Sequence, residues 1–221
     1  AFERASLISP VSSQKRKGVL ISSLSQKYSL IQSVRQATEK VGAFLEIHGC
    51  DASLEARGRY VVDHFWQVPP LEQWTPELLL RYAEEHQIGA IIPTRDEELA
   101  FFAQHKALFQ NHGIAVFVSH LDTVRLSLDK WAFARFLEEK GLPGIPTALQ
   151  MGDLLSAKTY VVKPRWGAGG REIRLRCSLA EAISFAKGIQ NPLFQPFVEG
   201  QEWSFDVYRS AIQGVVGVVA R

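Results

Sequence analysis

Residues 161–171 read Val-Val-Lys-Pro-Arg-Trp-Gly-Ala-Gly-Gly-Arg, and this stretch decides how the second part of the chain folds. The two valines continue an apolar segment that begins at Tyr160, which predicts a short buried strand. The glycines at 167, 169 and 170 predict a flexible loop, and residues 172–176 read as a second strand. Because a loop and not a helix joins the two strands, we expect them to pair in antiparallel fashion.

Lys163 closes the first of these strands. An unpaired ammonium group is costly to bury, so a lysine at the end of an apolar strand predicts an anionic partner. Backbone N–H groups of the glycine loop, together with Lys163, would form a cradle for phosphate oxygens. A flexible hairpin with a solvated lysine explains this segment alone equally well. The stretch is not a Walker A loop, because no Gly-Lys-Ser/Thr appears and a strand follows it.

The first part of the chain alternates apolar strands with amphipathic helices. Strands are predicted at 19–21, 44–47, 90–92 and 114–118, and helices at 30–41, 77–85 and 96–107. Thr75 and Asp96 are expected to cap the second and third of these helices. This alternation predicts an α/β fold with a mostly parallel, doubly wound sheet over 18–119.

A helix over 129–141 leads into a second part with a different pattern. After the glycine loop we expect a helix through Ala186, with Ser178 and Glu181 as a capping box, and an extended segment at 193–195. Apolar and polar side chains alternate over 203–207, which predicts a half-buried strand. Residues 215–220 form an apolar strand that would need further chain to cover it.

The composition is that of a globular protein. The 221 residues include 25 basic and 23 acidic side chains, a formal charge of +2, and 46% of them are hydrophobic. These dispersed charges create no field for nucleic acid or for an anionic membrane surface. No apolar run approaches the roughly 20 residues that span a bilayer, and Cys50 and Cys177 match no disulfide framework. We therefore expect a cytoplasmic protein without a nucleic-acid or membrane partner.

A second motif lies at 195–202, Gln-Pro-Phe-Val-Glu-Gly-Gln-Glu. Extended backbone at 196–198 could offer a carbonyl and an N–H group to an adenine edge, and the Glu202 carboxylate could accept hydrogen bonds from ribose hydroxyls. A strand, a turn and a surface carboxylate explain this segment alone as well. Similarly, Lys130 by itself reads as a solvated helix residue that follows the N-cap Asp129.

In order and spacing, Asp129-Lys130, the stretch at 161–171 and the stretch at 195–207 together resemble the ATP-grasp superfamily. Within it the chain is most similar to proteins related to the large subunit of carbamoyl-phosphate synthase, and the likeness covers nearly everything after residue 17. The resemblance implies a Rossmann-like parallel-sheet pre-ATP-grasp domain followed by an incomplete α+β ATP-grasp domain. The implied parts are a flexible arm at 1–17, the Rossmann-like domain at 18–120, the nucleotide lobe with its linker helix at 121–198, and the start of the C-terminal lobe at 199–221.

The same resemblance implies ATP and Mg²⁺ as cofactors. The residues that would bind ATP are Lys130, Lys163, Trp166, Gly167, Ala168, Gly169, Gly170, Gln195, Phe197, Val198 and Glu202. The two lysines would contact phosphates, and the glycine loop would fold over them as a flap. Gln195, where many members carry glutamate, would approach the adenine amino group. Residues 197–198 would form the hinge at the adenine edge, and Glu202 would hold the ribose. The Mg²⁺ ligands are expected beyond Arg221, so no metal ligand or catalytic residue is assigned.

The implied function is that of an ATP-dependent ligase. A carboxylate such as bicarbonate would form an acyl phosphate, and an amine-type nucleophile would displace the phosphate. The partners would then be small-molecule carboxylates and amines, and a homodimer is compatible with the family. The chain opens at Ala1 and its only methionine is Met151, so we expect a fragment. Because the metal ligands are expected beyond Arg221, this fragment should be inactive alone.

Three other functions stay open from the sequence. A non-catalytic adenine-nucleotide-binding regulatory domain would share the ATP contacts and lack the metal carboxylates. A dinucleotide-dependent oxidoreductase would need a Gly-x-Gly-x-x-Gly turn, and Ser22-Ser23-Leu24-Ser25-Gln26 has none. A structural interaction module would leave Lys163 solvated. Thr94, Arg95 and Asp96 could also reach a substrate, whereas His48, Cys50 and Asp51 complete no metal-ligand pattern and read as structural.

Overall fold

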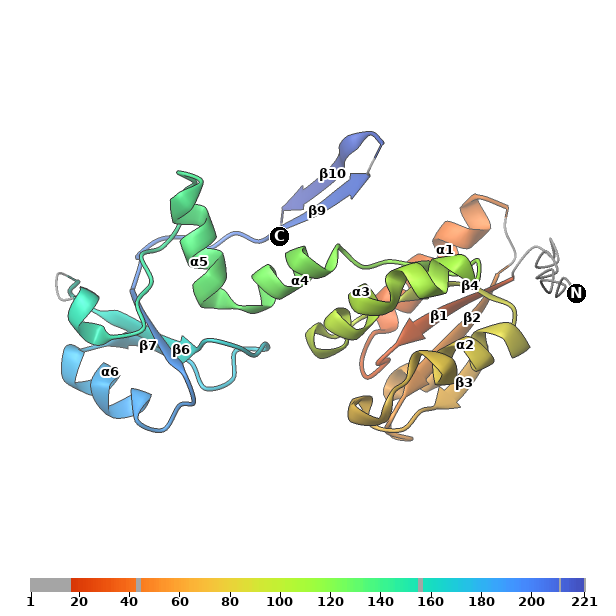
Figure 1. The fold of residues 1–221 in the computed structure, drawn as a ribbon, viewed down its shortest axis with the longest axis horizontal. Helices are drawn as coiled ribbons and strands as arrows, with labels where there is room; N and C mark the ends of the chain where they lie inside the picture. Colours follow the sequence, from red (N-terminus) through yellow and green to blue (C-terminus); the bar gives the residue numbers. More distant parts are fainter. Residues whose placement is uncertain (1–16, 43–44, 155–156, 211, 221) are drawn as a thin grey trace, which may run out of the picture. The chain divides into compact units, whose positions relative to one another are not determined.

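The structure, a computed structural model, describes residues 17–42, 45–154, 157–210 and 212–220. The predicted arm therefore lies outside the described residues, except for Lys17. The chain divides into two compact units, one up to Phe133 and one from Ala134 onward (Figure 1). No helix in the described ranges is long and apolar enough to cross a membrane.

A five-stranded parallel sheet forms the centre of the first unit (Figure 1). Its strands are β1 (Gly18–Ser22), β2 (Glu46–Asp51), β3 (His64–Gln67), β4 (Ile88–Ile92) and β5 (Ala115–Val116). Their order across the sheet is β3-β2-β1-β4-β5, and every pair is parallel. The chain thus adds β2 and β3 on one side of β1 and then β4 and β5 on its other side. This reversal between β1 and β4 is the topological switch point of a doubly wound sheet.

Helices cover both faces of this sheet. The helices of the unit are α1 (Tyr28–Lys40), α2 (Pro76–Glu85), α3 (Asp96–Asn111) and α4 (Leu121–Leu128), while α5 (Lys130–Glu139) spans the division between the units. Successive strand residues point to opposite faces, so two cores form. On one face Leu20 and Ile91 pack with side chains of α2 and α3, including Leu79 and Phe102. On the other face Ile21, Ile47 and Ile92 pack with Leu30, Ile31 and Val34 of α1.

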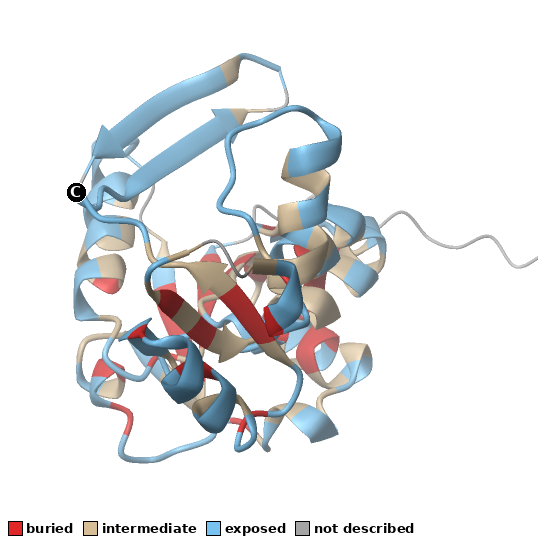
Figure 2. Ribbon diagram, turned by 90° about the vertical axis from the view of Figure 1, so that its left-hand side faces the viewer, coloured by how far each residue is buried: buried red, intermediate tan, exposed pale blue. Residues whose placement is uncertain are grey.

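The second unit contains a three-stranded antiparallel sheet. Its strands are β6 (Tyr160–Pro164), β7 (Arg174–Cys177) and β8 (Pro192–Pro196), in the order β7-β6-β8. One face packs against α6 (Leu179–Ala186) through a core that includes Tyr160, Val162 and Ala182 (Figure 2). The predicted capping box of α6 is confirmed, because Ser178 Oγ accepts the Glu181 N–H and Glu181 Oε2 accepts the Ser178 N–H. Short 3₁₀ turns lie at Arg57–Tyr60, Leu71–Gln73 and Met151–Leu154.

A separate hairpin follows, made of β9 (Phe205–Ser210) and β10 (Gly214–Ala220). Its strands pair with each other, and their residues are almost all exposed (Figure 2). The prediction of a half-buried strand at 203–207 is therefore wrong in two respects, since β9 begins at Phe205 and both of its faces are open. Alternation of apolar and polar residues shows that one face of a strand can be buried. Among the described residues, however, no element covers the apolar face of β9.

The predicted α/β and antiparallel patterns are both present, with local differences. The sequence did not predict β3, whose His-Phe-Trp-Gln has no apolar run, or α4, which directly precedes α5. The prediction that Asp96 caps α3 is wrong, because the N-cap is Arg95 and Asp96 is already helical. The reason is Glu98, whose carboxylate accepts the N–H groups of Thr94 and Arg95 and so fixes the helix start one residue earlier.

Candidate functional site

The sheet of the second unit carries Lys163 and Gln195 on one face. Side chains of β6 alternate, and Val162 is buried toward α6, so Lys163 points to the opposite face. In the antiparallel register Val161 pairs with Gln195 and Lys163 pairs with Leu193. Paired residues share a face, so Lys163 and Gln195 are diagonal neighbours on that face. The Cα atoms of such a pair are about 7–8 Å apart. The structure thus brings together two residues that the sequence predicts at opposite ends of a bound ATP.

The amide of Gln195 has a defined orientation. Its Nε2 donates a hydrogen bond to Thr147 Oγ1 at 2.7 Å. Thr147 lies just before Ala148, which forms a β-bridge with Phe194. Because Nε2 is held by the hydroxyl, the carbonyl oxygen is the end that can accept a hydrogen bond from a ligand amine.

The loop after β6 requires glycine for conformational reasons. Gly167, Gly169 and Gly170 have φ values of 109°, 74° and 69°, a region that other residues rarely adopt. A Cβ atom at any of the three would meet nothing within 4 Å, so the space around this loop is open. At its start the guanidinium of Arg165 lies over the Trp166 ring, 4.5 Å from the ring centre. The loop therefore has a flexible backbone and begins at a positively charged residue, Arg165. Its role as a flap over phosphates stays a prediction.

The predicted adenine hinge follows β8 directly. Phe197 donates its N–H to the Thr159 carbonyl at 2.9 Å, which ties the hinge to the start of β6. Arg176 of β7 lies 4.6 Å from the centre of the Phe197 ring and also donates to Glu199 at 3.2 Å. Val198 is exposed, and Glu202 is exposed as well. The hinge is thus anchored at Phe197 and open to solvent beyond it.

Lys130 begins α5 and belongs to the first unit. Asp129 Oδ1 accepts the N–H groups of Trp131 and Ala132, so the predicted N-cap is confirmed. Partial burial lowers the pKa of Lys130, and the carboxylates of Asp96 and Asp129 counteract this effect. The predicted convergence of Lys130 and Lys163 on one triphosphate stays a prediction.

The switch point of the parallel sheet is filled by a buried carboxylate that the sequence did not reveal. Glu98 of α3 is 1% exposed. Its Oε1 accepts from Ser22 Oγ at 2.7 Å, from the Thr94 N–H at 2.6 Å and from the Arg95 N–H at 3.0 Å, and its Oε2 accepts from Ser23 Oγ at 2.9 Å. Thr94 Oγ1 in turn donates to the carbonyl oxygens of Ser22, at the end of β1, and of Ser23, at 2.7 and 2.9 Å. Thr94 is therefore committed to this network, in the place where α/β sheets commonly bind ligands.

The turn after β1 is also closed. Leu24 is fully buried, and a Cβ atom on Gly49 would lie 2.4 Å from its Cδ1. A dinucleotide site needs backbone N–H groups that approach a pyrophosphate at this turn. Leu24 and Glu98 occupy that region, so the first unit does not fit a dinucleotide-dependent oxidoreductase.

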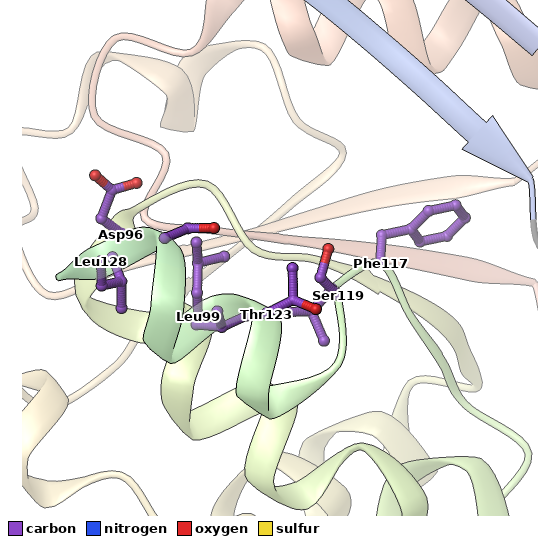
Figure 3. A pocket seen from close by; sticks show the side chains of 9 residues that line it. Asp96, Leu99, Phe117, Ser119, Thr123 and Leu128 are labelled. Carbon is purple, nitrogen blue, oxygen red and sulfur yellow. The ribbon is translucent and has the colours of Figure 1, made fainter. Parts of the chain in front are cut away.

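A cavity of about 300 Å³ lies between α3 and α4 (Figure 3). It is lined by Asp96, Leu99, Phe117, Val118, Ser119, Thr123, Val124, Ser127 and Leu128. Asp96 and Phe117 lie at its two ends, with the Ser119 and Thr123 hydroxyls near Phe117 (Figure 3). The single charged side chain in this lining is a carboxylate, which repels phosphate, and the volume is at the lower limit of small-molecule sites. We therefore do not assign the nucleotide to it.

The described residues do not fit a Mg²⁺ site. Within the described ranges, the group of His, Cys, Asp and Glu side chains close enough to share an ion is Glu46, His48 and His64. Mg²⁺ prefers oxygen ligands, whereas two of these three residues offer imidazole nitrogen. This cluster therefore does not suit Mg²⁺, and Mg²⁺ as a cofactor stays a prediction.

Two different families match successive parts of the chain. Residues 19–117 match the family described as the PylC-like N-terminal domain, and residues 127–218 match the ATP-grasp domain. A comparison with curated protein sequences finds no significant match. The narrower likeness to carbamoyl-phosphate synthase stays a prediction.

Solved structures of similar fold include a biotin carboxylase domain and two N5-carboxyaminoimidazole synthetases. The biotin carboxylase domain of 2-oxoglutarate carboxylase from Hydrogenobacter thermophilus, crystallised as a dimer with MgADP, ADP and bicarbonate, is 19% identical, with a TM-score of 0.59 over 84% of this chain and 45% of that one. N5-carboxyaminoimidazole synthetase from Staphylococcus aureus, complexed with ADP, is 15% identical, with a TM-score of 0.62 over 86% of this chain and 50% of that one.

The corresponding ribonucleotide synthetase from Thermotoga maritima is 16% identical, with a TM-score of 0.62 over 92% of this chain and 53% of that one. The chain thus spans about half the length of these structures. Identities this low show a common fold, and the family matches assign its two parts. The chain therefore belongs to the ATP-grasp superfamily, with a PylC-like N-terminal domain ahead of its ATP-grasp domain.

Proposed function

We propose that the second unit binds ATP on the face of its sheet that lies opposite α6, as the nucleotide-binding part of a carboxylate–amine ligase. The observation that carries this proposal is the shared face of Lys163 and Gln195, next to a glycine loop, within an ATP-grasp domain. Lys163 would then meet the phosphates at the end of β6 where the loop begins. Gln195 would meet the adenine nearer the other end.

The polar groups at each end suit this orientation of the nucleotide. The Gln195 carbonyl oxygen is available to accept the adenine amino group, because Nε2 is engaged by Thr147. The segment at 197–198 follows β8 directly, and the exposed Glu202 carboxylate can accept hydrogen bonds from ribose hydroxyls. At the other end, Lys163 and the N–H groups of residues 166–170 would surround phosphate oxygens.

The reaction that we propose has two balanced steps. A carboxylate oxygen attacks the terminal phosphorus of ATP, and the bond from that phosphorus to the β–γ bridging oxygen breaks. The products of this step are ADP and an acyl phosphate. An amine nitrogen then attacks the acyl carbon, inorganic phosphate leaves, and the amine loses one proton. Charge builds on the transferring phosphoryl group, so Lys163 would act by electrostatic stabilisation and positioning.

The structural neighbours support the substrate class. Two of the structures described above contain an adenine nucleotide: the Staphylococcus aureus synthetase is complexed with ADP, and the biotin carboxylase domain with MgADP, ADP and bicarbonate. We infer that this chain takes a small-molecule carboxylate and an amine-type acceptor in the same chemistry. The homodimer and the inactivity of this chain alone stay predictions, and measurement of ADP release by the isolated chain tests the second.

Calorimetric titration of the chain with ATP tests the nucleotide site. We expect saturable binding, and the Lys163→Ala variant should bind at least about tenfold more weakly, because a hydrogen bond to a charged group contributes about 1.5–3 kcal/mol. Lys187→Ala is the matched control, since Lys187 is exposed at the end of α6, which packs on the other face of the sheet. A parallel titration with NAD should give no binding heat.

Two results would contradict this assignment. Equal ATP affinity in the Lys163→Ala and Lys187→Ala variants would show that Lys163 does not meet the nucleotide. Binding of NAD with affinity similar to that of ATP would point to the first unit and to a different function.

A further inference from the structure

We propose that Glu46, His48 and His64 form a binding site for a divalent transition-metal ion, best suited to Zn²⁺, at the edge of the parallel sheet. The three side chains come from β2 and β3. Their ligand atoms, one carboxylate oxygen and two imidazole nitrogens, all lie within 4.8 Å of one another. All three residues belong to the first unit, whereas Lys163 and Gln195 belong to the second.

The parallel register of β2 and β3 creates this cluster. His48 pairs directly with His64, and their rings stack with centroids 4.5 Å apart. Glu46 precedes His48 by two positions on β2, so both side chains leave the same face of the strand. Sequence spacing could not reveal this arrangement, because the second histidine comes from the neighbouring strand. The interpretation of His48 as structural was therefore made without knowledge of its neighbour His64.

Two of the three separations between ligand atoms, both measured from Glu46, fit a tetrahedral metal ion. Glu46 Oε2 lies 3.6 Å from His48 Nε2 and 3.5 Å from His64 Nε2. Zn²⁺ binds nitrogen and carboxylate oxygen at about 2.0–2.2 Å, which places two tetrahedral ligands roughly 3.3–3.6 Å apart. The longer of the two observed separations is beyond a hydrogen bond, yet both match the edge of such a tetrahedron.

His48 supplies the second and independent observation. Its side chain is 1% exposed, and its Nε2 has no hydrogen-bond partner among the described residues. A buried polar nitrogen without a partner is costly, so this one calls for a ligand that the protein itself does not supply. The nitrogen lies beside the Glu46 carboxylate and so points into the proposed site.

The other nitrogen of His48 is already oriented as in known metal sites. His48 Nδ1 lies 2.9 Å from the Tyr82 hydroxyl, and Tyr82 stacks on Trp66 with ring centres 4.0 Å apart. When Nδ1–H donates to Tyr82, the lone pair of Nε2 is directed at the metal.

The chemistry of the ligand set selects the metal. Two imidazoles and one carboxylate suit Zn²⁺ and its neighbours in the first transition row, whereas Mg²⁺ and Ca²⁺ prefer oxygen alone. Three protein ligands leave a fourth position for water or for the exposed His86, whose ring centre lies 5.3 Å from that of His48. Because β3 is the edge strand of the sheet, the ion would fasten it to β2.

Titration of the whole chain, first stripped with a chelator, tests the proposal with Zn²⁺ in calorimetry and with Co²⁺ in visible absorption. We expect one ion per chain and a rise in the unfolding temperature on addition of Zn²⁺. The His64→Gln and Glu46→Gln variants should each bind Zn²⁺ at least about tenfold more weakly, since even loss of an outer partner costs about 10–100-fold. Both residues are largely exposed, at 48% and 60% of their side-chain surface, so folding should survive.

The control is another histidine with a carboxylate neighbour. His112 lies 3.0 Å from Glu84 at the surface of the same unit, so His112→Gln should leave Zn²⁺ affinity unchanged. Tyr82→Phe, which keeps the ring stack, should weaken binding about tenfold through the orientation of His48. The proposal is overturned if the wild-type chain binds no stoichiometric Zn²⁺, or if His64→Gln and Glu46→Gln bind it as tightly as His112→Gln.

Discussion

Replacement of Glu98 by alanine should strongly destabilise the first unit. The carboxylate accepts two hydroxyl and two backbone N–H hydrogen bonds at the switch point of the sheet. After truncation the hydroxyl of Ser22 can turn to the Ile92 carbonyl, which lies 3.4 Å away. The N–H groups of Thr94 and Arg95 cannot turn in this way, and each orphaned N–H costs about 1–3 kcal/mol.

With the cavity that the side chain leaves, we expect a loss of about 3–5 kcal/mol in the free energy of unfolding. At a urea dependence of about 2 kcal/mol/M, this lowers the unfolding midpoint of the unit by about 2 M. Urea unfolding followed by circular dichroism measures the shift. Glu98→Gln should lose much less, because its carbonyl oxygen can still accept the two N–H groups.

The neighbouring Glu97 provides the control. Its carboxylate forms an exposed ion pair with Arg95 at 3.3 Å, so Glu97→Gln should change stability by less than about 0.5 kcal/mol. If Glu98→Ala unfolds within about 1 kcal/mol of Glu97→Gln, the buried carboxylate does not organise the switch point and our account of this network is refuted.

Three further predictions concern the first unit. Gly49→Ala should lose about 1–3 kcal/mol in urea unfolding, because the new Cβ would lie 2.4 Å from Cδ1 of the fully buried Leu24; a neutral effect would show that this core is loosely packed. Thr75→Ala should lose about 1 kcal/mol, since Thr75 Oγ1 accepts the Leu78 N–H at the start of α2, and unchanged thermal unfolding would contradict that role. For Asp63, burial raises the pKa, but hydrogen bonds from the Ile47 N–H and from Arg35 outweigh burial and leave the pKa below its ordinary value. Its folded pKa is thus below the unfolded value, so Asp63 adds stability above the unfolded pKa of about 3.9, and this contribution is lost as the pH falls through the folded pKa. The stability difference between wild type and Asp63→Asn should therefore shrink in acid, and a difference independent of pH would contradict the sign.

Local patterns in the sequence were sufficient for most of the elements. Thr75 ahead of Pro76 and the pair of Ser178 and Glu181 mark helix starts through short-range hydrogen bonds, which depend on neighbouring residues alone. The apolar runs of β1 and β4 likewise indicate buried parallel strands without reference to the rest of the chain.

Features that depend on contacts between distant residues escaped sequence analysis. Glu98 reads as one acidic residue among several at the start of α3, and its role appears only when the end of β1 lies beside it. His48 and His64 meet through strand pairing, which no local spacing encodes. The same limit explains β9, because alternation along a strand does not show whether another element covers it.

The candidate nucleotide site lies between these cases. Lys163 and the glycine loop are evident from the sequence, and the loop glycines have positive φ values that glycine adopts readily. The diagonal pairing of Lys163 with Gln195 required the register of β6 and β8. That register places residues of the two motifs, Lys163 and Gln195, on the same face of the sheet.

A crystal structure of the chain with a non-hydrolysable ATP analogue tests the central claim most directly. We predict phosphate oxygens within about 3 Å of Lys163 Nζ and the adenine amino group at the Gln195 carbonyl oxygen, on the face of the sheet opposite α6. A nucleotide bound in the first unit, or on the side of the sheet that α6 covers, would contradict the account.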